Sequence, residues 1–237
     1  MASPSAVLAC LVASSSASPT RVLMVGDSMT AADLGIALER EMSKVRTISW
    51  RRQGRSGTGL SRREGFDWLQ ELERILDRER PEVVLVTIGG NDGQSLTWPR
   101  REGRERGAHL AFGTEEWAAE YRARVSRFLE VALGEGRRVL WLEIPRRDPR
   151  ELEERAQRIR ELTRPIVEGH PRASFLETRW IFQTPEGPLE KVLGPRGLPL
   201  PLHQRDGVHF SAAGAAFVAR LLSPRILAAI SASRAAP

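Results

Sequence analysis

Short apolar runs recur along the chain and alternate with longer amphipathic segments. The runs are rich in β-branched and large apolar residues and are bounded by glycine, proline or charged residues, which is typical of buried strands. We expect strands at residues 21–25, 47–50, 83–88, 139–144 and 173–177. The run at 83–88 does not alternate with polar residues, so both faces of that strand should be buried.

Between these runs, apolar residues recur at the three- and four-residue spacing of one helix face. In the first such segment, Leu34, Leu38 and Met42 share a face. Thr114 and Ser211 are suited to cap two later helices. The expected helices cover residues 31–45, 68–76, 115–133, 151–167 and 212–232. Strands alternating with helices predict an α/β protein: a three-layer α/β/α sandwich around a central, mostly parallel five-stranded sheet.

The irregular segments lie mostly where such a fold binds ligands, outside the carboxyl ends of its strands. They include the turn after the first strand, a loop at 51–65 and a polar loop at 89–113. Loops as long as the last one, without structure of their own, are often functional. A Pro- and Gly-rich stretch at 178–208 is compatible with a lid, a specificity loop or a packing element.

Composition places the chain among ordinary globular proteins. Of 237 residues, 41% are hydrophobic and 28% are charged, which favours one domain spanning residues 21–237. The formal net charge is +6, but arginines alternate with glutamates, as at 151–158, so we expect solvated helix faces and no nucleic-acid partner. One cysteine and four histidines give no basis for a disulfide framework or a Cys-based zinc site, and we expect no metal and no cofactor.

The first 20 residues differ from the remainder. They carry no charged side chain, and an apolar run at 6–13 is followed by small residues at 16–18. This pattern is similar to a secretory signal without its basic start, and residues 7–10 approach a lipoprotein signal, while a disordered tail is the alternative. We therefore expect an exported protein, with a cytoplasmic one as the alternative. No segment has ~20 uninterrupted apolar residues, so no stable membrane span is expected.

A serine stands where the first strand gives way to a helix, in the sequence Gly26-Asp27-Ser28-Met29. A small hydroxyl in this position can act as a nucleophile, because backbone N–H groups at the start of a helix favour negative charge. For this turn alone a helix cap is the simpler interpretation, since Ser and Asp are common caps.

Two further segments offer partners for such a serine. Asn91, in the Gly-Gly-Asn-Asp turn at 89–92, can donate its side-chain amide to a developing oxyanion. Asp206 precedes His209 by three residues, so its carboxylate can accept the Nδ1–H of the imidazole and leave Nε2 as a general base. Taken singly, each segment is also explained as a turn or a helix cap.

Together, the chain order Ser28, Asn91 and Asp206-x-x-His209 resembles the SGNH (GDSL-type) hydrolase superfamily. The match extends from residue 21 to about 222. Segments similar to a little-characterised bacterial branch of the superfamily lie at 56–62, 66–68 and 141–145. The resemblance implies a flavodoxin-like fold and an enzyme that acts on ester bonds, with Ser28 as nucleophile, His209 as base and Asp206 as its orienting carboxylate.

The resemblance also implies an oxyanion hole formed by the Ser28 N–H, a glycine of the second block and the Asn91 amide. Gly54 is the first choice for that glycine, because an Arg-Ser pair follows it and its distance from Ser28 along the chain fits; Gly57 and Gly59 are the alternatives. A glycine suits this role because its N–H must approach the substrate closely.

Several other residues near these motifs are candidates for supporting roles. Asp27 and Asp92 are expected to support their turns without reacting. Candidates for substrate binding are Arg55, Gly57, Arg62, Gln94, Trp98 and Arg205. The remaining histidines, His109, His170 and His203, are expected on the surface or in loops.

Three functions fit this set of residues. The first is a serine esterase that removes short acyl or acetyl groups from a small-molecule or carbohydrate ester. An O-acyltransferase acting on a cell-envelope carbohydrate would use the same serine, and a carbohydrate-binding protein could keep the fold without the chemistry. The Gly-x-Ser-x-Gly elbow and the phosphate-binding glycine motifs are absent. The sequence leaves the substrate and the oligomeric state open.

Overall fold

The computed structural model describes residues 18–235 except 104, 106 and 149. The signal-like segment expected at 1–20 lies almost entirely outside this part of the chain. The first strand begins at Thr20, directly after it.

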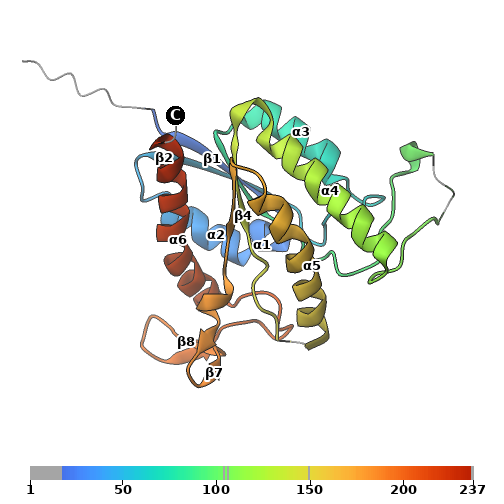
Figure 1. Ribbon diagram of the computed structural model, residues 1–237. Helices are drawn as coiled ribbons and strands as arrows, with labels where there is room; N and C mark the ends of the chain where they lie inside the picture. The colour runs from blue at the N-terminus through green and yellow to red at the C-terminus, as the bar shows by residue number, and fades with distance from the viewer. Residues whose placement is uncertain (1–17, 104, 106, 149, 236–237) are drawn as a thin grey trace, which may run out of the picture.

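Five parallel strands form the central sheet (Figure 1). They are β1 (Thr20–Gly26), β2 (Ile48–Gly54), β3 (Val83–Thr87), β4 (Arg138–Leu142) and β5 (Ala173–Leu176). Their order in the sheet is β2-β1-β3-β4-β5, and every pair is parallel. This order reverses direction between β1 and β3, which creates a crevice at the carboxyl ends of these two strands. The predicted parallel five-stranded sheet is confirmed.

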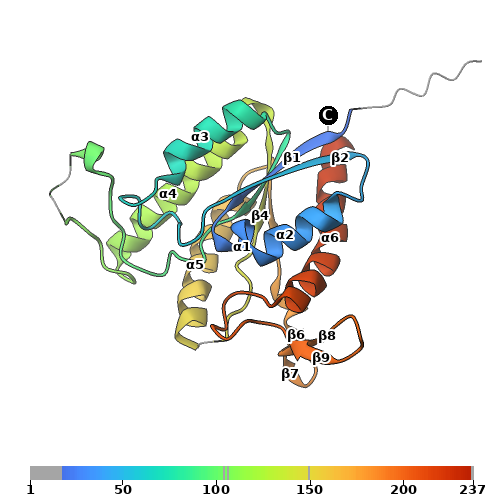
Figure 2. The ribbon, with the colours of Figure 1, turned by 180° about the vertical axis from the view of Figure 1, so that it is seen from behind.

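Helices cover both faces of the sheet. They are α1 (Ser28–Ala31), α2 (Asp33–Met42), α3 (Trp68–Glu79), α4 (Glu115–Leu133), α5 (Arg150–Glu168) and α6 (Ala212–Ala235). Short 3₁₀ turns are η1 (Arg100–Glu102), η2 (Gly134–Gly136) and η3 (Arg179–Ile181). Helices α3, α4 and α5 lie on one face, and α1, α2 and α6 lie on the other (Figures 1 and 2). The predicted three-layer sandwich is confirmed.

Alternate residues of each inner strand enter two separate cores. In β1, Leu23 and Val25 pack among residues of α3, α4 and α5, whereas Val22 and Met24 pack among residues of α2 and α6. All four are at most 1% exposed. Because successive side chains of a strand point to opposite faces, an uninterrupted apolar run is what a sheet covered on both faces requires.

The helix predicted over 31–45 is divided in two. Helix α1 ends at Ala31 and α2 begins at Asp33, because Ala32 takes a non-helical backbone conformation with φ −123° and ψ −139°. Leu34, Leu38 and Met42 are buried as expected. The break leaves α1 as a single turn that begins at the candidate nucleophile.

The predicted helix caps are present. The Thr114 side chain accepts a hydrogen bond from the Trp117 N–H, and the Ser211 side chain accepts one from the Gly214 N–H. These bonds satisfy N–H groups that have no partner within the helix. The caps explain why α4 and α6 begin where the sequence predicts.

The stretch at 178–208 contains two small hairpins. Strand β6 (Gln183–Thr184) pairs with β7 (Gly187–Pro188), and β8 (Lys191–Leu193) pairs with β9 (Pro199–Pro201). Val192 and Leu202 are buried in the core beneath α6. At least part of this stretch is therefore a packing element that leads into the segment before α6.

Helix α6 is the one helix among the described residues that is long and apolar enough to cross a membrane, over Ala212–Ala232. Its residues Val218, Leu222 and Ile226 are buried against the sheet and α2. In this fold the apolar character of the helix serves core packing.

Candidate active site

The candidate nucleophile lies at the crevice where the strand order reverses. Strand β1 ends at Gly26, Asp27 caps α1, and Ser28 is the first residue of that helix. A side chain at Gly26 would collide with Thr87 at the end of β3, so the close approach of the two strand ends requires glycine. The turn therefore holds Ser28 at the carboxyl edge of the sheet, beside the loop that follows β3.

Three side chains from two distant parts of the chain form one hydrogen-bonded series. The Ser28 Oγ lies 2.8 Å from the His209 Nε2, and the His209 Nδ1 lies 2.7 Å from the Asp206 Oδ2. Ser28 follows β1, while Asp206 and His209 lie just before α6. These distances are those of good hydrogen bonds between a serine, a base and an orienting carboxylate.

The turn at 206–209 fixes the carboxylate. Asp206 Oδ1 accepts hydrogen bonds from the backbone N–H groups of Val208 and His209, each at 2.9 Å. Gly207, with φ +65°, lets the chain reverse tightly enough for both bonds. Partial burial acts to raise the pKa of Asp206, but hydrogen bonds from the His209 ring and from these N–H groups lower the pKa to about 2. Asp206 is consequently an anion near neutral pH and accepts the Nδ1–H.

Asn91 enters the site from the loop after β3. Its Nδ2 donates to the Thr58 carbonyl at 2.9 Å, which uses one of its two amide hydrogens. Its backbone carbonyl accepts the Gln94 side-chain amide at 2.6 Å. Asn91 thereby connects this loop to the loop after β2, and its second amide hydrogen has no acceptor among the described residues.

The three candidate oxyanion glycines have different surroundings. At Gly59, an added Cβ would collide with the Asp92 Oδ1. Gly54 ends β2, and a side chain there would collide with the backbone of Thr30 and Ala31 in α1. Gly57 lies in the following turn with φ +72°, and a Cβ added to it would have no neighbour within 4 Å. Thr58, which holds the Asn91 amide, directly follows Gly57. Gly54 and Gly57 are both exposed, but Gly54 packs closely against α1, whereas Gly57 lies next to the residue that holds the Asn91 amide.

Asp27 is buried behind the nucleophile. Its Oδ1 accepts the Met29 N–H at 2.9 Å, and its carboxylate also accepts the Gly90 N–H. Burial raises the pKa of Asp27 to about 6, although these bonds and the nearby Arg147 charge act to lower it. Among the described residues, no hydrogen bond joins the Asp27 side chain to the side chains of Ser28, His209 or Asp206; its bonds go to the backbone of Met29 and Gly90.

Asp92 is also buried, and it connects three elements. Its Oδ1 accepts the Ser61 N–H at 2.9 Å, and its Oδ2 accepts the Tyr121 hydroxyl of α4 at 3.0 Å. Arg124, one turn further along α4, donates to the carbonyls of Leu60 and Ser61. These contacts hold the loop after β2 in place beside Asn91.

A pocket of about 390 Å³ adjoins the site. Asn91, Gln94, Asp206 and His209 line it, so the structure brings these predicted residues together. Its other lining residues are Gly89, Gly90, Gly93, Arg147, Leu152, Arg155, Ala156 and Val208.

Other predicted substrate-binding residues lie elsewhere. Arg55 stacks on Phe66, with its guanidinium 4.5 Å from the ring centre, and Arg205 is exposed outside the pocket wall. Arg62 and Trp98 line a separate hollow of about 800 Å³ formed with residues of the polar loop. Closeness in sequence to the motifs did not distinguish these positions: Arg205 directly precedes Asp206, yet it does not line the pocket.

Two residues near the site were not anticipated from the sequence. His203, expected on the surface or in a loop, is buried between Phe182 and Phe210, with its Nδ1 3.3 Å from Asp148. Burial lowers the pKa of His203 against the effect of that carboxylate. Arg147, in the loop after β4, lines the pocket. Ser28 and Asn91 were selected because they follow strands at the edge of the sheet where ligands bind. Arg147 follows β4 at the same edge, so the same rule could have identified it.

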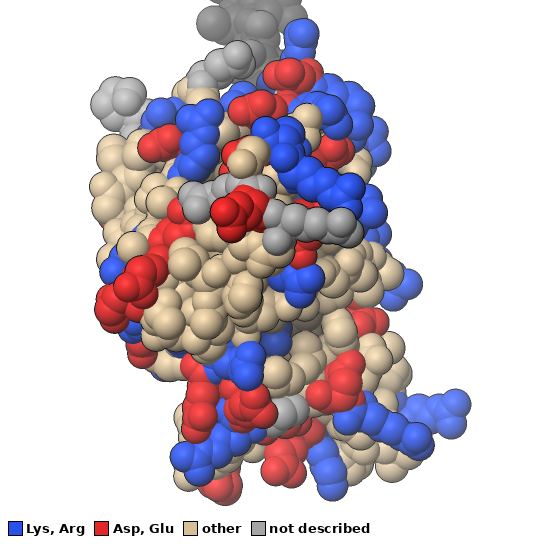
Figure 3. All heavy atoms as spheres, turned by 90° about the vertical axis from the view of Figure 1, so that its right-hand side faces the viewer, with Lys and Arg blue, Asp and Glu red and all other residues tan. Residues whose placement is uncertain are grey.

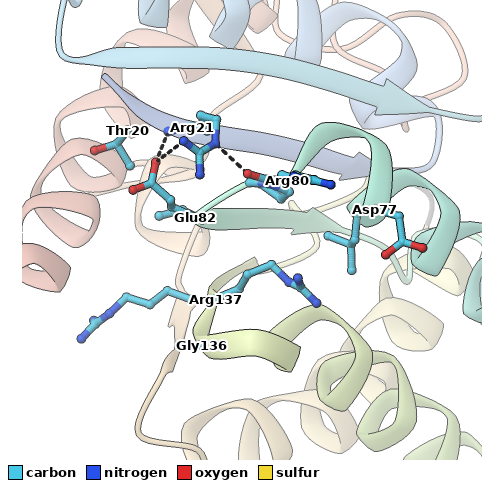
Figure 4. Close-up of a pocket in the computed structure, with 11 residues that line it drawn as sticks. Thr20, Arg21, Asp77, Arg80, Glu82, Gly136 and Arg137 are labelled. Carbon is cyan, nitrogen blue, oxygen red and sulfur yellow. Dashed lines mark hydrogen bonds and ion pairs between the residues drawn. The ribbon is translucent and has the colours of Figure 1, made fainter. Parts of the chain in front are cut away.

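A second hollow of about 620 Å³ lies at the opposite, amino-terminal edge of the sheet (Figure 4). Arg21 there pairs with Glu82 and donates to the Arg80 carbonyl. Arg137 donates to carbonyls at the end of α4. None of the predicted site residues lines this hollow.

The charged surface is mixed in sign. Figure 3 shows arginine and lysine side chains interleaved with aspartate and glutamate on one face of the molecule. This mixture matches the alternation in the sequence, as in the pairs of Arg155 with Glu151 and of Arg164 with Glu168. Among residues 18–235, apart from the three undescribed positions, no group of three or more His, Cys, Asp or Glu side chains is arranged to hold a metal ion.

The architecture is the fold of the SGNH (GDSL-type) hydrolases. The chain belongs to a family described as a protein of unknown function (DUF459), whose model matches residues 21–225. No curated protein shows a significant match.

Solved structures share this fold at low sequence identity. An α/β hydrolase enzyme from the metagenome of Lake Arreo is 17% identical, with a TM-score of 0.59 over 91% of this chain and 96% of that one. A catalytic mutant of an acetylxylan esterase from Geobacillus stearothermophilus is 18% identical, with a TM-score of 0.58 over 88% and 94%. A GDSL-like lipase from Bacteroides thetaiotaomicron is 18% identical, with a TM-score of 0.56 over 89% of both chains. At such identities the likeness concerns the fold.

Proposed function

We propose that this protein is a serine esterase that hydrolyses carboxylic esters of short acyl groups, acetyl included. The observation that carries the proposal is the continuous hydrogen-bonded series from Asp206 through His209 to Ser28. The pocket beside it, at about 390 Å³, is near the small end of the roughly 300–1,000 Å³ typical of ligand sites. A small acyl group or a single sugar unit fits such a volume better than a long acyl chain.

In the first half-reaction, the Ser28 Oγ attacks the ester carbonyl and its proton passes to the His209 Nε2. Asp206 keeps the imidazole in the orientation that presents Nε2 to Ser28 and stabilises the imidazolium that forms. The tetrahedral intermediate then collapses, and His209 returns the proton to the departing alkoxide. The products at this stage are the free alcohol and an acyl-enzyme on Ser28.

In the second half-reaction, water attacks the acyl-enzyme. His209 takes a proton from that water, and the collapse of the second tetrahedral intermediate returns the proton to the Ser28 Oγ. The products are the carboxylic acid and the free enzyme. An acyltransferase would differ only in using a sugar hydroxyl in place of this water.

Both intermediates carry a negative oxygen that needs hydrogen-bond donors. We assign these donors to the Ser28 N–H, the second amide hydrogen of Asn91 and the Gly57 N–H. Gly57 replaces Gly54, the first choice from the sequence, because Gly54 packs against α1 while Gly57 adjoins the residue that holds the Asn91 amide.

The proposal is tested by turnover of p-nitrophenyl acetate and longer p-nitrophenyl esters by the wild type and Ser28→Ala. We expect the wild type to prefer short chains and Ser28→Ala to lose ~10³-fold or more in turnover. Equal activity in purified Ser28→Ala would contradict the mechanism. If the wild type releases no p-nitrophenol, labelling of Ser28 by a fluorophosphonate separates a transferase or selective esterase, which reacts, from a binding protein, which does not.

A further inference from the structure

Arg147 and Arg155 are charged side chains of the active-site pocket that the proposed reaction does not use. Arg147 lies in the loop between β4 and α5 and shares the pocket wall with Asn91 and His209. A Cβ added to Gly90 would come within 2.6 Å of the Arg147 Nη2 and 2.8 Å of the Asp27 Oδ2. The guanidinium therefore lies directly over Gly90, next to the turn that carries Asn91.

The carboxylates around Arg147 are already engaged by other groups. Asp27 accepts backbone N–H groups of Met29 and Gly90, and Asp206 accepts His209 and the N–H groups of its own turn. Glu153 of α5 is held by the Arg160 guanidinium at 2.9 and 3.0 Å and by the backbone N–H of Arg147. These acidic groups act on the Arg147 charge only through space.

The neighbouring arginines make hydrogen bonds with their guanidinium groups, whereas that of Arg147 has none to the described residues. Arg155 donates to the Gly93 carbonyl at 2.6 Å and to Glu151 at 2.7 Å. Arg160 donates to the Ile144 carbonyl and to Glu153. Within the described part of the chain, no acceptor bonds the Arg147 guanidinium, whose largely desolvated setting lowers its pKa. A planar fork of donors in this position is suited to a carboxylate, which it can bind through two parallel hydrogen bonds.

We propose that Arg147 binds a carboxylate of the substrate, so that the preferred substrate is an anionic ester. This inference deepens the proposed esterase function and rests on it. The carboxylate can belong to the acyl group, as in the half-ester of a dicarboxylic acid, or to the alcohol, as in an acetylated uronic acid. In both cases one anion lies beside the ester that Ser28 attacks. Esters that carry the carboxylate on the acyl group or on the alcohol distinguish the two cases.

The test compares charged and neutral members of two matched ester pairs. For the acyl side, the pair is p-nitrophenyl hemiglutarate and p-nitrophenyl pentanoate, in which a methyl group stands in for the carboxylate. For the alcohol side, the pair is the mono-O-acetylated methyl glycosides of glucuronic acid and glucose. For each pair, the ratio of kcat/KM for the charged ester to that for the neutral ester is measured. This ratio is independent of the fraction of enzyme that is correctly folded.

We expect the wild type to prefer the charged member of one pair, and the pair identifies the source of the carboxylate. Arg147→Gln should lower that ratio by ~10- to 100-fold, as expected for loss of a charge-assisted hydrogen bond, mainly through KM. Arg147→Lys should retain part of the preference, because the charge remains without the planar fork. Arg150→Gln, which removes an arginine whose side chain is 93% exposed, is the control and should keep the wild-type ratio.

Other outcomes overturn the inference in distinguishable ways. Equal rates for charged and neutral esters in both pairs, or an unchanged ratio in Arg147→Gln, would refute the carboxylate site while leaving the esterase proposal standing. A wild type that cleaves neither member of either pair and resists fluorophosphonate would refute the esterase proposal and this inference with it.

Discussion

At the scale of single residues, the candidate site depends on hydrogen bonds between groups far apart in the sequence. Ser28 and His209 are separated by 181 positions, yet the Ser28 Oγ and the His209 Nε2 lie 2.8 Å apart. Each partner is also held by its own turn: Asp27 caps the helix that begins at Ser28, and Asp206 binds the backbone of His209. Local bonds of this kind fix the orientation of reactive groups before any substrate binds.

Asn91→Ala tests the oxyanion hole at this scale. We expect kcat to fall by ~10²–10³, because one donor to the negative oxygen is lost. The substitution also removes the bond to the Thr58 carbonyl, so thermal unfolding should be followed with the kinetics. A large loss of kcat with a nearly unchanged midpoint of thermal unfolding supports the catalytic role of Asn91. Unchanged turnover would remove Asn91 from the oxyanion hole.

At the scale of elements, the loop after β2 is held by contacts from three directions. Thr58 binds the Trp68 indole of α3 and the Asn91 amide, while Asp92 and Arg124 hold the backbone of residues 60 and 61. The turn at Gly57 is thereby carried on a rigid base. This arrangement explains how a loop without regular structure can present an N–H group to a substrate reproducibly.

Substitution of the two glycines separates packing from catalysis in this loop. Gly54→Ala should lower the midpoint of thermal unfolding, because the new methyl group meets the α1 backbone. In Gly57→Ala the new methyl group has no neighbour within 4 Å. The left-handed backbone at φ +72° costs an alanine roughly 1–2 kcal/mol, and the turn concerned is exposed. We expect Gly57→Ala to lower kcat, by up to ~10²-fold if the N–H leaves the oxyanion hole, with a smaller change in the midpoint. Wild-type kcat in Gly57→Ala, with a large loss in folded Gly54→Ala, would instead assign the oxyanion N–H to Gly54.

At the scale of the whole molecule, the buried Asp27 makes the free energy of unfolding depend on pH. The folded protein raises the pKa of Asp27 from 3.8 to about 6, so between these values it binds the proton more tightly than the unfolded chain. Stability contributed by this group is therefore lost as pH rises through that window. Asp206, whose pKa is lowered to about 2, acts in the opposite direction: its contribution is lost as pH falls below about 4.

Asp27→Asn should abolish the part of the pH dependence that lies between pH 4 and 7. Over this interval the wild type should lose about 3 kcal/mol relative to the variant, from roughly two pKa units at 1.36 kcal/mol each. Urea unfolding of both proteins at several pH values measures the difference. Asp77→Asn, on the exposed side of α3, is the control and should follow the wild type. If the free energy of unfolding depends on pH in the same way in the wild type and in Asp27→Asn, the pKa of Asp27 is not raised in the folded protein.

The sequence by itself determined the layers of the fold and predicted the residues of the candidate site that the structure brings together. Apolar runs without alternation identify buried strands, and helical periodicity places Leu34, Leu38 and Met42 on one inward face. Both signals arise locally, since a residue's side of a strand or helix follows from the backbone period alone. The alternation of the two patterns then restricts the topology to a parallel sheet, with its ligand edge at the strand ends.

Tertiary structure decided what local patterns cannot encode: which loops converge at that edge. The sequence placed Arg55 and Arg205 as close to the motifs as Gln94, yet only Gln94 lines the pocket, and Arg147 enters it from a loop that carried no motif. The choice between Gly54 and Gly57 as the oxyanion glycine likewise depends on where α1 packs. The break at Ala32 that ends α1 involves neither glycine nor proline, so the local sequence does not predict it. Loop paths are set by long-range packing and by single buried bonds, such as that of Asp92 to Ser61, whose partners are 31 positions apart.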